Sequence, residues 1–247
     1  MDRDVRGRSR TGMSEGPPMG RITWKPVTSA QWGDLVGLFG PRGACGGCWC
    51  MWWRLSRRDF SRLKGDGTRR ALKRLVERSP APGILAYDGD RAVGWCCVGP
   101  REDFPLLERS RVLARVDDEP VWSIVCFFVA RDHRRRGLTR RLIAAAVSYA
   151  ASRGARIVEA YPTDASAGQP DAFVYTGLSS AFTAKGFVEV ARRSKRRPIL
   201  RRRIRRGGSR PAARSARTPR PPRRTPCSAG PRGRSSGAPV PRRGSRR

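Results

Sequence analysis

The sequence predicts a mixed α/β (α+β) fold, in which a mostly antiparallel sheet holds one central parallel strand pair and carries helices on both faces. Residues 121–129 are nearly all apolar and rich in β-branched and aromatic side chains, as in a strand covered on both faces. Residues 138–150 repeat apolar side chains at helical spacing, and a second strand pattern follows at 156–161. A strand, a helix and a strand in this order predict a parallel crossover.

The segments before this central unit predict antiparallel neighbours. Residues 21–27 form a short strand pattern, followed by a helix that ends near Gly40. Residues 57–64 and 68–78 predict a helix pair. Residues 83–87 and 91–98 flank the turn Asp88-Gly89-Asp90 and predict a hairpin. The charged stretch 101–118 predicts an irregular insertion or short helix.

The chain after the central unit predicts the rest of one domain and a tail. We expect a helix at residues 178–185 and a closing antiparallel hairpin from 187–192 and 198–202. The expected organisation is therefore a disordered leader at 1–20, one domain at 21–202 and a disordered tail at 203–247. The tail is rich in Arg, Pro, Gly and Ser, a composition that cannot bury a core.

The charge is strongly positive and uneven. The chain has 53 Lys and Arg against 20 Asp and Glu, a net charge of +33, and residues 201–247 hold 17 Arg and no acid. Such a surface attracts polyanions without sequence specificity. Only five basic residues are Lys, so we weigh a nucleic-acid or membrane-surface arm against a disordered or out-of-frame end produced by GC-rich coding, and we favour the latter.

Nothing in the sequence predicts a membrane protein or a secreted one. There is no apolar run near the roughly 18 residues that a membrane span needs, and the N-terminus lacks an apolar signal core. We therefore expect a cytoplasmic protein whose seven Cys are reduced thiols.

The turn between the central strand and the long helix is the strongest candidate site. Arg134, Arg135 and Arg136 precede Gly137, where the helix opens. Backbone N–H groups at a glycine turn and a helix N-terminus bind anions, and Arg suits phosphate oxygens. A Walker loop is excluded because no Gly-Lys-Ser/Thr follows, and a dinucleotide fingerprint lacks its three glycines.

These residues resemble the GNAT superfamily of acetyl-CoA-dependent N-acetyltransferases. The family signature (Arg or Gln, two residues, Gly, one residue, then Gly or Ala) stands here as Arg134-Arg135-Arg136-Gly137-Leu138-Thr139, with Thr at the last position. The segment 181–187, ending in Gly186-Phe187, resembles a later family helix. The resemblance covers roughly residues 21–203 in outline and is specific only near 128–140 and 182–187.

The resemblance implies a site for acetyl-CoA, the acyl-donor co-substrate, where the central parallel strands splay apart. Backbone groups of Phe128 and Val129 are then expected to pair with the pantetheine arm. The N–H groups of the turn hold the pyrophosphate, so the implied cofactor-binding residues there are Arg134, Arg135, Arg136, Gly137, Leu138, Thr139 and Arg140.

Three Cys and three Trp are concentrated between Cys45 and Trp53. The spacing of Cys45, Cys48 and Cys50 would allow three metal thiolates, but no fourth ligand is obvious, and we expect buried thiols and no metal. In the family this loop faces the acceptor. The candidates for a wall of the acceptor pocket are therefore Trp49, Trp52 and Trp53, whose rings suit a cationic amine. The alternative is that these three residues belong to the core.

The catalytic groups are less well indicated. Glu159 lies in the second parallel strand and is the candidate base, against a surface or structural role. The family's frequent general-acid Tyr corresponds to Phe182, so Tyr175 or Tyr161 would have to substitute. Cys126 is expected to be an inert buried thiol.

Two functions remain open. The first is an N-acetyltransferase that moves acetyl from acetyl-CoA to a primary amine by direct attack. The alternative is a basic nucleic-acid-associated or CoA-sensing protein with a catalytically silent scaffold. The turn favours the first, whereas the Arg-rich tail and Phe182 favour the second more weakly.

Overall fold

The computed structural model describes residues 20–164 and 174–204. The predictions for the leader and for nearly all of the tail lie outside these residues. At the boundary, Arg203 still belongs to the last strand, and the N–H of Ile204 donates to the carbonyl of Arg156 at 2.8 Å.

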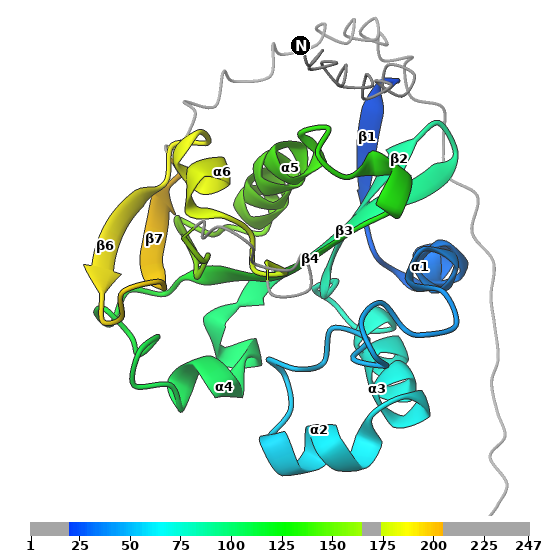
Figure 1. Cartoon of the computed structure of the whole chain (residues 1–247), viewed down its shortest axis with the longest axis horizontal. Coiled ribbons are helices and arrows are strands. Elements are labelled where there is room, and N and C mark those ends of the chain that lie inside the picture. The colour runs from blue at the N-terminus through cyan, green and yellow to red at the C-terminus, as the bar shows by residue number, and fades with distance from the viewer. Residues whose placement is uncertain (1–19, 165–173, 205–247) are drawn as a thin grey trace, which may run out of the picture. The chain divides into compact units, whose positions relative to one another are not determined.

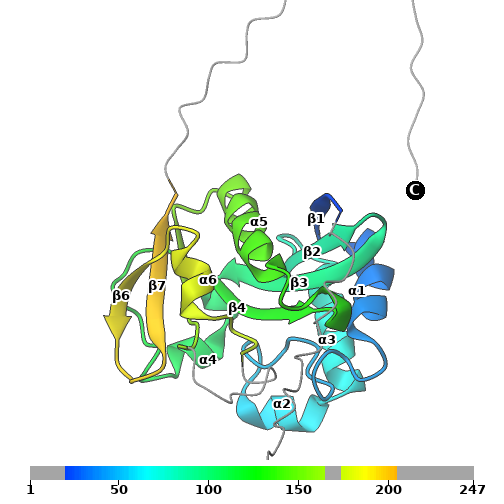
Figure 2. The same ribbon diagram turned by 45° about the horizontal axis from the view of Figure 1, so that its top comes forward.

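The described chain forms one seven-stranded sheet with the order β1-β2-β3-β4-β5-β7-β6 (Figure 1). Only β4 and β5 are parallel, and every other neighbouring pair is antiparallel, as the sequence predicted. The strands are β1 Ile22–Pro26, β2 Gly83–Asp88, β3 Arg91–Pro100, β4 Trp122–Val129, β5 Ile157–Ala160, β6 Val188–Arg192 and β7 Pro198–Arg203. The β6–β7 hairpin forms the sheet edge beyond β5 (Figure 2).

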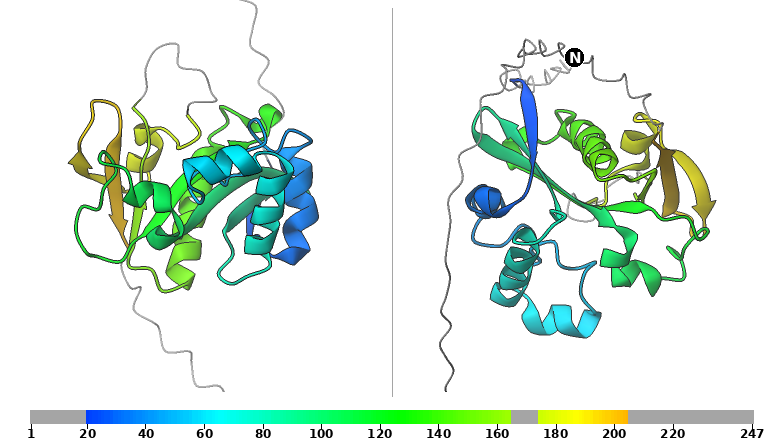
Figure 3. Two further views of the ribbon diagram at one scale, coloured as in Figure 1. Left: turned by 90° about the horizontal axis from the view of Figure 1, so that it is seen from below. Right: turned by 180° about the vertical axis from the view of Figure 1, so that it is seen from behind.

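Helices cover both faces of the sheet, which confirms the predicted fold class. In Figure 1, α5 and α6 lie on one face and α1 to α4 on the other, and the views from below and behind agree (Figure 3). The helices are α1 Trp32–Phe39, α2 Arg57–Leu63, α3 Asp66–Val76, α4 Pro105–Glu108, α5 Leu138–Ser152 and α6 Ser179–Thr183. The stretch 101–118 contains only a 3₁₀ turn and α4, as expected of an irregular insertion.

The long helix α5 is fixed against the sheet by its apolar stripe. Leu138, Leu142 and Ile143 are fully buried, which is what the helical spacing of apolar residues predicted. A Cβ on Gly94 of β3 would lie 3.1 Å from Leu142 and 3.2 Å from Leu138, so a glycine at this point lets the helix approach closely. This contact sets the position of the turn that precedes α5.

The parallel strands β4 and β5 are paired for only part of their length. Trp122, Ser123 and Ile124 pair with residues 158–160, and β4 then continues to Val129 without β5. In the gap, the N–H of Phe127 donates to the carbonyl of Tyr175 at 2.6 Å. The sheet therefore opens between β4 and β5 beyond Ile124, where the resemblance implied the acetyl-CoA site.

Candidate functional site

The turn between β4 and α5 has the backbone of an anion-binding nest. Arg135 has φ +59° and Gly137 has φ +76°, so left-handed residues alternate with ordinary ones just before the helix. This alternation directs successive N–H groups into one concavity. A left-handed backbone is costly for Arg135 and easy for Gly137, which explains a glycine at this position.

The N–H groups of the turn are available to a ligand. Within the part of the chain that the structure describes, the N–H groups of residues 135–139 donate no backbone hydrogen bond, whereas that of Arg140 donates to the carbonyl of Gly137. Arg135, Gly137 and Arg140 are exposed. The structure thus brings together the seven residues from 134 to 140, with the side chain of Leu138 in the core and only its backbone facing the turn.

Polar contacts hold the turn in place. His133 is buried, with Nε2 3.1 Å from Asp88 Oδ2 and Nδ1 3.0 Å from Asp132 Oδ1. Arg91 Nη1 contacts the same Asp132 at 2.6 Å. The contacts of His133 and Arg91 with Asp132 lower the pKa of this carboxyl to about 2, so Asp132 stays ionised at neutral pH.

Of the two strand residues expected to meet pantetheine, Val129 is the better placed. The N–H of Ala130 donates to Val93 of β3, and Phe128 is paired with Trp95 of the same strand. Alternate residues direct their backbone groups to opposite sides of a strand, so Phe128 faces β3 while Val129 faces the gap. The carbonyl of Val129 also accepts from Arg134 Nε at 3.2 Å. The side chain of Phe128 instead packs edge-on against Phe39.

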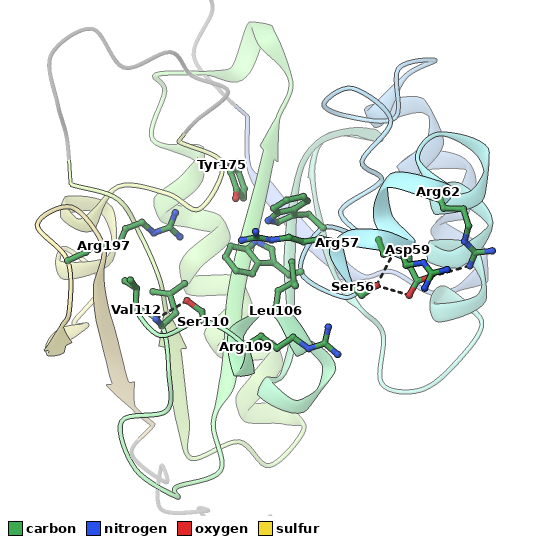
Figure 4. Close-up of a pocket in the computed structure, with 15 residues that line it drawn as sticks. Ser56, Arg57, Asp59, Arg62, Leu106, Arg109, Ser110, Val112, Tyr175 and Arg197 are labelled. Carbon is green, nitrogen blue, oxygen red and sulfur yellow. Dashed lines mark hydrogen bonds and ion pairs between the residues drawn. The ribbon is translucent and has the colours of Figure 1, made fainter.

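An open cleft of about 1230 Å³ lies beside this gap (Figure 4). Its walls come from the loop after α1, from α2, from the segment around α4, and from the turn between β6 and β7. Tyr175 joins the two places, because its carbonyl bonds Phe127 of β4 and its side chain lines the cleft.

Glu159 lies outside the cleft, in a buried ion network. Its side chain is fully buried, and both carboxylate oxygens are engaged. Oε1 accepts from Arg101 Nη1 at 2.8 Å and from the Tyr161 hydroxyl at 2.6 Å, while Oε2 accepts from Arg201 Nε at 2.5 Å. Burial raises the pKa of Tyr161 well above its usual range, so its phenol stays protonated here. This geometry is that of a structural ion pair.

A family model described as "Acetyltransferase (GNAT) family" matches residues 49–172, which is half of the chain. The chain belongs to the GNAT acetyltransferase family. Membership makes acetyl-CoA the co-substrate, as the sequence predicted, and the signature turn lies inside the matched region. No curated protein matches the sequence.

Several solved structures are similar to this GNAT chain. The PaiA N-acetyltransferase of Thermoplasma acidophilum, in complex with coenzyme A, is 10% identical over 74% of this chain and 99% of its own, with a TM-score of 0.44. A GNAT family acetyltransferase of Listeria monocytogenes is 7% identical over 74% of this chain and 95% of its own, with a TM-score of 0.47. One of Bacillus cereus is 12% identical over 76% of this chain and 100% of its own, with a TM-score of 0.44. The family assignment rests on the sequence match.

The three tryptophans of this GNAT chain occupy different places. Trp52 and Trp53 line the cleft. Trp49 does not, because its ring packs with Trp32 and Phe39 in the core, with ring centroids 6.0 and 5.5 Å apart. Of the three predicted acceptor-wall residues, two therefore line the cleft and one lies in the core.

Among the phenols considered for the family's acid, only Tyr175 lies in the cleft. Phe182, at the family's Tyr position, is fully buried against Phe127 and Phe187. Tyr161 is committed to Glu159 and to Arg101 Nη1, 2.7 Å away. Burial raises the pKa of Tyr175 against the opposing effect of Arg197, so Tyr175 is protonated at neutral pH.

The cysteines do not form a metal site within residues 20–164 and 174–204: no group of three His, Cys, Asp or Glu there is arranged to hold an ion. Cys50 is buried, 3.4 Å from Cys126 Sγ, and Trp95 Nε1 donates to it at 3.1 Å. The hydrogen bond with Cys50 acts to lower the pKa of Cys126, but burial raises it overall. Cys45, in contrast, is exposed.

Two further cleft residues, Arg57 and Arg197, were not predicted from the sequence. Both line the cleft from opposite walls. In a chain with so many arginines, neither stands out from its neighbours. Separately, none of the helices that the structure describes is long and apolar enough to cross a membrane.

Proposed function

We propose that this protein transfers an acetyl group from acetyl-CoA to a primary amine by direct attack of the amine on the thioester. The observation that carries the proposal is the continuous arrangement of turn, gap and cleft. The nest at 135–139 suits a pyrophosphate, Val129 faces the gap with its backbone, and Tyr175 joins the gap to the cleft. The thioester would then lie between the cofactor turn and an acceptor in the cleft.

In this proposal Tyr175 donates the proton that the departing CoA sulfur needs. A general acid must hold its proton at working pH and reach the reacting atoms, and Tyr175 is protonated and lies where gap and cleft meet. Replacing it with Phe removes the proton and keeps the ring. We expect Tyr175→Phe to lower kcat by about 10²- to 10⁴-fold while acetyl-CoA affinity stays the same.

We assign no base role to Glu159, although the sequence suggested one. Its two oxygens already accept hydrogen bonds from Arg101, Arg201 and Tyr161, and it does not line the cleft. We propose that the amine proton leaves to water in the open cleft. In this proposal Glu159 acts as a positioning residue, which holds β5 in place through Arg101 and Arg201.

Calorimetric titration of acetyl-CoA into the full chain, at 200 mM salt, tests the co-substrate site. We expect stoichiometric binding, abolished by Gly137→Glu, because a carboxylate and a strained backbone then occupy the nest. The matched control is Gly154→Glu, at the other end of α5. Gly154 is also left-handed (φ +86°), and a side chain there meets nothing within 4 Å. Loss of binding in both variants, or in neither, would contradict the proposal.

The alternative is a basic nucleic-acid-associated or CoA-sensing protein with a catalytically silent scaffold. Its CoA-sensing form binds acetyl-CoA and loses it in Gly137→Glu, but it transfers no acetyl group to an amine. Its nucleic-acid-associated form gives a different result in the titration itself. If the chain only binds polyanions, acetyl-CoA binding by the folded full chain would weaken with rising salt, and Gly137→Glu would not change it. A cytoplasmic location and non-specific polyanion binding by the tail remain predictions from the sequence.

A further inference from the structure

We infer that the amine acceptor carries an anionic group, a carboxylate or a phosphate, which the arginine-lined wall of the cleft binds. This inference rests on the proposed function, because it names the substrate class of the same site. It replaces the expectation of a simple cationic amine held by tryptophan rings.

The charges that line the cleft are the first argument. Five arginines line it against a single acid, Asp59: they are Arg57, Arg58, Arg62, Arg109 and Arg197. Asp59 is already committed, because its Oδ1 lies 3.3 Å from Arg62 Nη2 and its Oδ2 accepts from the Ser56 hydroxyl at 2.8 Å. The electrostatic potential in the cleft is therefore positive, and it attracts anions and repels cations.

Buried donors without partners are the second, independent argument. Trp53 Nε1 and Arg197 Nε are buried, and neither has a hydrogen-bond partner within the described residues. The side chain of Trp53 is more than nine-tenths buried. Both atoms can only donate, so only an acceptor atom satisfies them. The Ser194 hydroxyl, in the same lining, is also buried and has no hydrogen-bond partner among the residues that the structure describes. A ligand oxygen in the cleft would supply the missing partners.

The direction of two arginine side chains defines where the anion sits. Figure 4 shows Arg57 and Arg197 reaching toward the middle of the cleft from opposite walls, with Tyr175 above them. Arg57 makes no side-chain hydrogen bond or ion pair with any residue that the structure describes. Arg197 is held by its Nη2, which donates to the Tyr161 carbonyl at 3.1 Å, and this leaves Nε for a ligand. Guanidinium groups bind carboxylate and phosphate oxygens as planar forks.

The same charges bear on the amine itself. With one ligand anion and Asp59 counted, five guanidinium groups still leave the cleft positive. A like charge nearby disfavours the ammonium form, so the acceptor amine loses its proton more readily there than in water. This explains how water can accept that proton without a carboxylate base in the cleft.

The test is product-side binding of matched acetylated probes to the full chain in the presence of CoA, measured by calorimetry at 200 mM salt. Three pairs differ only in the anionic group: N-acetylglycine and N-methylacetamide, N-acetylphenylalanine and N-acetylphenethylamine, and N-acetyl-O-phosphoethanolamine and N-acetylethanolamine. We expect at least one acid to bind about tenfold or more tightly than its neutral partner, as charge-assisted bonds to two arginines require. The first two pairs report a carboxylate and the third a phosphate.

Variants separate the cleft from the rest of this basic chain. Arg197→Gln and Arg57→Gln should each remove most of the preference for the acid. Arg153→Gln, a matched control at the C-cap of α5 whose guanidinium bonds Ser79, should keep it. No preference in any pair, or a preference that survives both cleft variants, would overturn the inference.

The proposed function is judged separately, by the acetyl-CoA titration. Acetyl-CoA binding without any preference for the acids sinks the inference and leaves the function standing. An acid preference lost in the two cleft variants, in a chain that does not bind acetyl-CoA, sinks the function and leaves an anion site.

Discussion

Glu159 is the residue on which three parts of the domain converge. It lies in β5, accepts from Arg201 of β7, and accepts from Arg101, which opens the segment leading to α4. Arg101 is itself buried and also donates to the Leu113 carbonyl at 2.8 Å and to Glu108 Oε1 at 2.8 Å. One carboxylate therefore fixes the segment 101–113, which supplies a wall of the cleft.

Removing this carboxylate should destabilise the fold. Glu159→Ala leaves the buried guanidinium groups of Arg101 and Arg201 without their shared partner, and breaking one side of a buried ion pair typically costs about 3–5 kcal/mol. Urea unfolding followed by circular dichroism measures it. Glu119→Ala, at an exposed position with no ion pair in the described chain, is the control and should change the free energy of unfolding by less than about 0.5 kcal/mol. Equal changes in the free energy of unfolding of the two variants would show that the ion network around Glu159 does not stabilise the fold.

Asp132 gives a pH dependence at the turn. Its pKa is lowered to about 2 in the fold, by His133 and then by Arg91, against about 4 in an unfolded chain. An acid whose pKa is lowered by folding contributes stability that is present above about pH 4 and is lost as the pH falls toward 2. Carbon NMR of the Asp132 carboxyl should show the low titration directly.

A neighbouring substitution tests the cause of that shift. Arg91→Gln removes the contact at 2.6 Å and should move the titration of Asp132 toward its usual range. Arg141→Gln, an exposed arginine on α5, is the control and should leave it unchanged. A titration of Asp132 near pH 4 in the unaltered protein would contradict the assignment.

At the scale of elements, the loop around Gly177 holds the gap between β4 and β5 in shape. The Gly177 carbonyl accepts from Thr163 at 3.0 Å, and Tyr175 bonds β4. Gly177 has φ +84°, and a Cβ there would lie 2.9 Å from a Phe182 ring carbon and 3.2 Å from one of Phe127. The glycine thus meets both a backbone and a steric requirement.

Gly177→Ala and Gly154→Ala form a matched pair that separates these requirements. Both glycines are left-handed, so each substitution carries a backbone cost of about 1–2 kcal/mol. Gly177→Ala adds overpacking against two rings, worth typically about 1–3 kcal/mol, whereas Gly154 has open space. We expect Gly177→Ala to lower the free energy of unfolding further and also to weaken acetyl-CoA binding. Equal losses in the two variants would show that the ring contacts do not matter.

The elements were largely predictable from the sequence, and the cleft was not. The strand 122–129 and the helix 138–152 follow from apolar periodicity, which is a local signal. Trp49 and Trp53 sit in one short run, yet one packs against α1 and the other lines the cleft. Which of them faces a ligand depends on the positions of α1 and α2, which no local pattern carries.

The same limit applies to Glu159 and Arg197. A strand position has two faces, but the two arginine partners of Glu159 lie 58 and 42 residues away along the chain. Arg197 lies in a turn among other arginines and lines the cleft only because β7 pairs with β5. Interactions between distant segments thus decided what the sequence left open.

At the scale of the whole molecule, the positive charge has two parts with different expected roles. In the cleft, arginines sit at fixed positions beside unpaired buried donors. Residues 206–247 carry a further 13 arginines and no acid, beyond the part of the chain that the structure describes. An excess of positive charge binds polyanions through counterion release, which is strongly salt-dependent.

Truncation after Arg205 should therefore separate the two kinds of anion binding. The cut keeps Ile204, whose N–H bonds Arg156, so we expect the free energy of unfolding to change by less than about 0.5 kcal/mol. The acetyl-CoA affinity at 200 mM salt should be unchanged, because the nest and its anchors lie between Asp88 and Arg140. Binding of a short single-stranded oligonucleotide should weaken, and its dependence on salt should become shallower. If the truncated chain instead loses acetyl-CoA, the tail is part of the co-substrate site, and the division of the positive charge into specific sites within residues 20–204 and a non-specific tail is wrong.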